Sequence, residues 1–196
     1  MKTFKNFINE TTEKLTTKED IQKWLDDMDI RKYTINSDLT VDVATDVFTL
    51  ADKHLINIPI KFGKVEGDFD CNGNRISSLE GCPDEVEGDF HCSDNLLNSL
   101  KGCPSKVGRN FYCVMNYLTS LKGCPKEING AFICNHNRIN SLEEGPEKVS
   151  GVFNCSHNLL KNLKGAPKYI GGSFLFYDNP ITDDTIYSKV IGKIVK

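Results

Sequence analysis

The amino-acid sequence predicts a repeat solenoid, in which short turns of chain stack around one continuous apolar core. Three columns of residues recur every 21 positions without an insertion, and columns of Leu, Pro and Val or Ile follow the same period. The three columns are Phe69, Phe90, Phe111, Phe132, Phe153 and Phe174; Cys71, Cys92, Cys113, Cys134 and Cys155; and Asn74, Asn95, Asn116, Asn137, Asn158 and Asn179. The repeating unit is V-x-G-x-F-x-C-x-x-N-x-[IL]-x-x-L-x-G-C-P-x-x.

Each unit contains one short stretch that alternates with period 2, Gly-x-Phe-x-Cys, which is typical of a β-strand. We expect Phe and Cys to point into the core and the residues between them to point outward. Asn should turn the chain, because its amide both donates and accepts hydrogen bonds and can satisfy the turning backbone. The Ile or Leu positions should fill the core on the return path, where Pro prevents a helix from continuing.

The segments on either side of the repeat are expected to cap it. Thr17 precedes acidic residues and apolar residues at helical spacing, which predicts an N-terminal helix over 17–29, followed by short strands at 33–35 and 39–43. Ile186, Val190 and Ile194 predict a C-terminal helix. The expected organisation is residues 1–10 as a separate segment, 11–46 as an N-terminal cap, 47–180 as the solenoid, with a degenerate first unit, and 181–196 as a C-terminal capping helix.

The segment from Phe69 to Leu79, F-D-C-N-G-N-R-I-S-S-L, resembles the leucine-rich-repeat core L-x-L-x-x-N-x-L-x-x-L, with Phe and Cys in the first two apolar positions. The resemblance covers about residues 47–180. It implies a right-handed coil with a parallel β-sheet on the concave face. Because the unit is short, we expect extended or 3₁₀ backbone on the convex side in place of a helix.

The first ten residues, M-K-T-F-K-N-F-I-N-E, resemble the capsid-targeting peptides of internal head proteins in T-even-like bacteriophages. Ile8-Asn9-Glu10 matches the cleavage motif of those peptides. The resemblance implies processing after Glu10 and packaging in a phage head. The alternative is a frayed helix or linker without a targeting role.

Composition and motif spacing argue against several classes of function. The net charge of −3 gives no basic excess for a nucleic-acid partner, and no apolar run is long enough to span a membrane. The N-terminus lacks the apolar core of a secretory signal, so a cytoplasmic location is expected. Cysteines that alternate at gaps of 11 and 10 do not match a zinc site and are expected to be reduced core residues. No nucleophile and base stand out, so we expect neither catalysis nor a cofactor.

The outward positions of the strands are the expected contact surface. They are acidic at the N-terminal end and become apolar and aromatic from Tyr112 to Leu175, and a contiguous exposed apolar patch commonly marks an interaction site. The expected partner-binding residues are Asp70, His91, Tyr112, Val114, Met115, Ala131, Ile133, Val152, Asn154, Leu175 and Tyr177.

The sequence therefore favours a non-catalytic module that binds a protein on its concave face, a host factor if the phage resemblance holds. Self-association through that face, coverage by the capping segments, and a packaged head protein without a strong partner stay open as alternatives. An effector enzyme of the ubiquitin-ligase kind is least favoured. Those enzymes need a separate domain with a nucleophilic Cys, and the residues outside the solenoid contain no cysteine.

Overall fold

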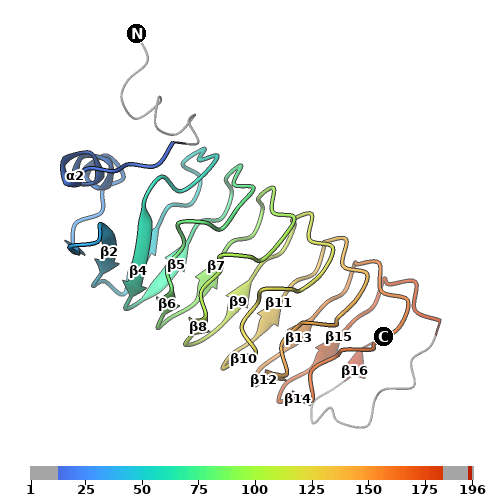
Figure 1. The fold of residues 1–196 in the computed structure, drawn as a ribbon. Helices are drawn as coiled ribbons and strands as arrows, with labels where there is room; N and C mark the ends of the chain where they lie inside the picture. Colours follow the sequence, from blue (N-terminus) through green and yellow to red (C-terminus); the bar gives the residue numbers. More distant parts are fainter. Residues whose placement is uncertain (1–12, 183–193, 196) are drawn as a thin grey trace.

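The computed structural model describes residues 13–182 and 194–195, which form a parallel β-solenoid (Figure 1). We call each 21-residue turn a rung. The Phe-containing strands pair rung to rung into one eight-stranded sheet, the Phe sheet, in which Phe69 lies opposite Phe90 and each later Phe opposite the next. Its strands are β3 (Val47–Thr49), β5 (Asp68–Asp70), β7 (Phe90–His91), β9 (Phe111–Tyr112), β11 (Phe132–Ile133), β13 (Phe153–Asn154), β15 (Phe174–Leu175) and β16 (Ile194–Val195). The predicted repeat solenoid is confirmed.

A second ladder of short strands runs beside the Phe sheet, built around the Val or Ile column. Its strands are β4 (Lys61–Val65), β6 (Glu85–Val86), β8 (Lys106–Val107), β10 (Glu127–Ile128), β12 (Lys148–Val149) and β14 (Tyr169–Ile170). Hydrogen bonding divides the ladder into two sheets, between β8 and β10. Turns and bends fill the rest of the return path. The described residues contain no 3₁₀ helix, and the return path has extended backbone only in these short strands.

The core between the ladders is made of the predicted inward columns. The Phe side chains of the full rungs and the five repeat cysteines are buried, and Phe176 takes the Cys position in the last rung. Neighbouring Phe ring centroids lie 5.0 to 5.7 Å apart along the stack. Burial of each Phe contributes about 1.5–3 kcal/mol to folding. This repeated apolar column holds the rungs at constant register.

The Asn column forms a hydrogen-bonded ladder at the corner where each rung leaves the Phe sheet. Asn116 is typical: its Nδ2 donates to the carbonyls of Cys92, Cys113 and Val114, and its Oδ1 accepts from the backbone N–H of Leu97. Two of those partners belong to the rung before. The residue preceding each Asn has a positive φ, at Gly73, Asp94, Met115, His136, His157 and Asp178, and Asp52 has one before Lys53 at the equivalent position of the degenerate first unit. The left-handed residue and the Asn together make the turn.

The N-terminal end of the stack is built from one helix and a hairpin. The helix α2 (Lys18–Asp27) begins after Thr17, whose side chain accepts from the N–H of Asp20, and it buries Trp24 against Phe62 at a centroid distance of 6.4 Å. The strands β1 (Tyr33–Ile35) and β2 (Thr40–Val43) pair antiparallel. β2 then pairs parallel with β4, so the second ladder extends back to residue 40.

The C-terminal end differs from the sequence expectation. Residues 183–193 and 196, which hold most of the predicted capping helix, lie outside the described residues. Ile194–Val195 form strand β16, parallel to β15, so the prediction that a helix includes residue 194 is wrong. The last rung would otherwise leave one edge of β15 without a strand partner, since the other edge pairs with β13. Pairing with β16 covers the open edge, which outweighs the local helical pattern.

Candidate functional site

The outer face of the Phe sheet carries one central column of outward side chains, one from each of the strands β5, β7, β9, β11, β13 and β15. The column is Asp70, His91, Tyr112, Ile133, Asn154 and Leu175. Its members are half-buried and directly opposite one another in the strand register. The predicted contact residues Val114, Ala131, Val152 and Tyr177 are also half-buried. The strand phase predicted from the period-2 pattern is therefore right.

The N-terminal half of this face is an organised polar cluster. The rings of His91 and Tyr112 stack at 4.5 Å with an interplanar angle of 6°. Arg109 donates to Asp68 at 2.8 Å, and its Nε lies 3.9 Å from Asp89. Partial burial, and then the negative charges of Asp89 and Asp68, raise the pKa of the Tyr112 hydroxyl. Arg109 therefore pairs with two of the carboxylates on this face.

Acidic and amide side chains beside that column also have a structural role. The carboxylate of Asp68 accepts from the N–H of Asp89, that of Asp89 from the N–H of Asn110, and the Asn110 amide oxygen from the N–H of Ala131. A second series runs from Asn72 to Ser93 and Val114. Both series end where the face becomes apolar. The sequence indicated an acidic outward face at this end, with Asp70 as the predicted contact, but did not predict these hydrogen bonds.

Four of the five exposed large apolar side chains in the described residues, Leu96, Met115, Tyr117 and Leu159, lie at the Asn corner, beside the Phe sheet rather than on it. Leu96, Met115 and Tyr117 are 43%, 55% and 43% exposed. With Asp94 and His136 they line an open depression of about 340 Å³ that spans adjacent rungs. We call Leu96, Met115 and Tyr117 the corner patch. Of its members the sequence predicted only Met115.

Met115 has a conformation that the fold does not favour for its residue type. Its φ is 52°, in the left-handed region where Gly, Asn, Asp and His are preferred. The equivalent rungs have Gly73, Asp94, His136 and His157 at this position. These residue types adopt the left-handed conformation readily. This preference explains why His136 and His157 occupy the turn position. At this position Met115 is not buried, and its residue type does not favour the backbone conformation.

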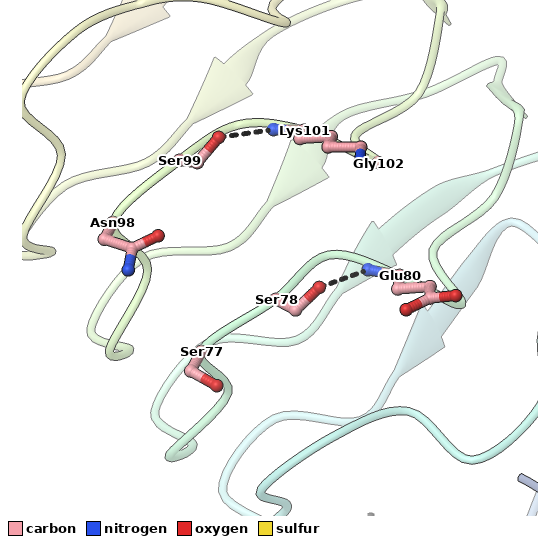
Figure 2. A pocket seen from close by; sticks show the side chains of 7 residues that line it. All are labelled: Ser77, Ser78, Glu80, Asn98, Ser99, Lys101 and Gly102. Carbon is pink, nitrogen blue, oxygen red and sulfur yellow. Dashed lines mark hydrogen bonds between the residues drawn. The ribbon is translucent and has the colours of Figure 1, made fainter.

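The return path carries a second depression, of about 410 Å³, between two adjacent rungs (Figure 2). Its lining is polar and comes from Ser77, Ser78, Glu80, Asn98, Ser99, Lys101 and Gly102. The hydroxyls of Ser78 and Ser99 accept from the backbone N–H of Glu80 and Lys101. The same bond recurs from Ser141 to Glu143. This groove is therefore a repeated turn, with no apolar anchor for a ligand.

The surroundings of the cysteine and histidine side chains indicate structural roles. All eight cysteines are free, and burial raises the pKa of the Cys103 and Cys124 thiols to about 12, which keeps them protonated. His136 and His157 stack at 4.1 Å, and His157 Nδ1 lies 3.3 Å from Asp178. No group of three or more His, Cys, Asp or Glu side chains in the described residues is arranged to hold a metal ion. None of the helices within residues 13–182 could cross a membrane.

The fold and its surface define a class: a parallel β-solenoid repeat protein with an apolar patch on one corner. No protein-family model, curated protein or solved structure matches the chain. The candidate site is therefore inferred from the geometry of the described residues. Leu96 and Tyr117 occupy the position directly after each corner Asn, where the sequence varies as Arg75, Leu96, Tyr117, Arg138, Leu159. Because Arg also occurs at this position, the large apolar residues there were the sequence signal that could have predicted the corner patch.

Proposed function

We propose that this chain is a short leucine-rich-repeat-type solenoid that binds a protein partner through the corner patch and the adjoining apolar half of the Phe sheet. The Asn ladder and the Phe and Cys core support the family assignment, because they occupy the positions of the leucine-rich-repeat motif. In the chain, Val114 lies between Tyr112 on the sheet face and Met115 of the patch. The work of the molecule is recognition rather than catalysis, in the cytoplasm of a host cell.

The single observation that carries the proposal is the exposure of Met115 in a left-handed turn. The turn would be more stable with Gly, Asn or Asp, and the core gains nothing from a side chain that points into water. Its neighbours Leu96 and Tyr117 are exposed beside it, and apolar anchors ringed by polar groups are typical of binding hot spots. A partner that covers Leu96, Met115 and Tyr117 explains why these three exposed positions have apolar side chains.

The proposal is tested by capture of partners on the immobilised full chain. The variant carries Leu96→Ser, Met115→Ser and Tyr117→Ser, and the control carries Leu159→Ser, an exposed leucine in the same column two rungs further on. A protein retained by the wild type and the control, and lost with the triple variant, is the expected result. Equal retention by all three chains contradicts the proposal.

Self-association through the same face is the competing use of the surface. Sedimentation velocity separates the two possibilities, because an apolar patch that pairs with a second copy makes the sedimentation coefficient rise with concentration. We expect a monomer for the wild type and for the triple variant. A dimer that dissociates in the triple variant would assign the patch to self-assembly.

A packaged internal head protein of a phage is a second candidate, favoured by the resemblance of residues 1–10 to capsid-targeting peptides. Those residues lie outside the described residues. The expected result is a mature chain that begins at Thr11, after cleavage at Glu10, in purified particles analysed by mass spectrometry. Particles that contain only the full-length chain, or none of it, contradict this candidate.

A further inference from the structure

The charges at the two ends of the corner patch indicate the chemistry of its partner, an inference that rests on the function proposed above. Arg75 and Arg138 occupy the same column as Leu96 and Tyr117, one rung before and one rung after them. The backbone N–H groups of this column each donate to a carbonyl of the preceding rung, at 2.8 or 2.9 Å. The four positions therefore stack in a straight row, about 4.8 Å apart from rung to rung.

Among the residues that the structure describes, neither of these arginines has an acidic partner. Arg31 pairs with Asp29 and Arg109 with Asp68, but neither Arg75 nor Arg138 forms an ion pair within the described part of the chain. Both are exposed. The guanidinium of Arg138 lies 4.6 Å over the Tyr117 ring, which orients it beside the patch. Two uncompensated cations thus bracket the apolar side chains.

One carboxylate lies between the arginines. Asp94 is exposed and lines the same depression as Leu96 and Met115. Its charge disfavours a second negative charge at the centre of the row. The surface is therefore positive at both ends and apolar, with a repelling carboxylate, in the middle.

We propose that the corner patch binds an extended segment of a partner protein with the pattern acid-x-apolar-x-acid. Three rung steps separate Arg75 from Arg138 by about 14 Å, and an extended chain advances about 3.4 Å per residue, so the two carboxylates stand four residues apart. Side chains at even spacing point to one side of an extended chain. The two acids contact the arginines, and the central apolar side chain enters the depression.

Fluorescence anisotropy with synthetic peptides tests the pattern on the full chain. The probe is a labelled peptide with the core Glu-Ser-Leu-Ser-Glu between Gly-Ser flanks. Comparison peptides replace both Glu by Gln, replace Leu by Ser, or insert one residue between Leu and the second Glu. Each change should weaken binding by about tenfold. Raising the salt concentration should weaken the Glu peptide and leave the Gln peptide unaffected.

Protein variants assign the contacts. Arg75→Glu with Arg138→Glu should abolish binding of the Glu peptide and create binding of a Lys-Ser-Leu-Ser-Lys peptide, while Arg31→Gln serves as the matched control and binds as the wild type does. Equal binding of Glu and Gln peptides, or absence of saturable binding at millimolar Glu peptide, overturns the inference. The function proposed above fails separately, when the corner-patch triple variant retains the captured protein.

Discussion

At the scale of single residues, the backbone groups at the corners of this solenoid are satisfied by one repeated side chain, Asn. Each corner Asn uses both halves of its amide, because the oxygen accepts one hydrogen bond and the two protons of the NH₂ group are shared among up to three carbonyls. The cysteines before Pro differ from the Asn column, because their chemistry is not required. Gly145 and Ala166 replace Cys at that position, so it requires a small side chain rather than a thiol.

The Asn ladder makes a direct prediction for Asn116→Asp. The carboxylate keeps the shape of the amide but cannot donate to the carbonyls of Cys92, Cys113 and Val114. We expect the variant to lose about 2–4 kcal/mol of unfolding free energy, measured by urea denaturation. The exposed Asn98→Asp should change stability by less than about 0.5 kcal/mol. Similar losses for both variants would show that the ladder does not stabilise the fold.

The buried thiols predict a loss of stability in alkali. Burial raises the pKa of Cys124 from 9.0 to about 12, so the unfolded chain releases this proton at lower pH than the folded chain does. The stabilising effect is complete below pH 9 and is lost between pH 9 and about 12, at up to about 1.4 kcal/mol per pH unit for each such thiol. Cys124→Ala should flatten the dependence of the unfolding free energy on pH in that window. An unchanged slope contradicts the assignment.

At the scale of elements, two-residue strands carry the fold because each is one rung of a long ladder. The inward and outward faces of a strand then differ sharply in what they contribute. Phe111 and Tyr112 are neighbours in β9, yet only Phe111 is buried between the rings of the rungs on either side.

This difference between faces is testable with Phe111→Ala against the double variant Tyr112→Ala with Ile133→Ala. Removal of the buried ring should cost about 3–5 kcal/mol, because it leaves a cavity in the Phe column. The double variant should cost about 1–2 kcal/mol and leave the circular dichroism spectrum unchanged, because both side chains point outward. A double variant that is as unstable as Phe111→Ala would mean that the face packs against something else.

The elements also show how far the sequence predicts this fold. The Phe and Cys columns were predictable because strict period-2 alternation specifies which side chains face inward. The second ladder was not, since a pair such as Glu85-Val86 is too short to show a period. Leu96 and Tyr117 were missed because their exposure depends on the left-handed turn before each Asn, which the alternation pattern does not describe. At the C-terminus, the helical spacing predicted a helix at Ile194, but this residue pairs with the open edge of the Phe sheet instead.

At the scale of the whole molecule, the solenoid is a linear array whose stability is a sum over rungs and their interfaces. Trp24 closes one end of the core and β16 extends the Phe sheet at the other. The period is uniform between them, so the array should tolerate the loss of a complete rung but not of part of one.

Deletion of residues 106–126 removes one period and should give a folded chain with a lower denaturant m-value, because less surface is exposed on unfolding. Deletion of residues 106–125 shifts the following strand by one residue, which turns each inward side chain outward at the junction. We expect that chain to be unfolded or strongly destabilised by circular dichroism and urea titration. Equal stability of the two deletions would contradict a fixed register.

The direction of the Asn contacts has a consequence for how the chain is made. Asn116 bonds to Leu97 and Cys92, and the other corner amides likewise reach back to the rung synthesised before their own. A newly translated rung therefore completes the corner hydrogen bonds of its predecessor, and its strand N–H groups in turn donate to the rung that follows it. Growth on the ribosome can lock the array progressively from the amino end, so that at any moment only the most recent turn awaits its polar partners.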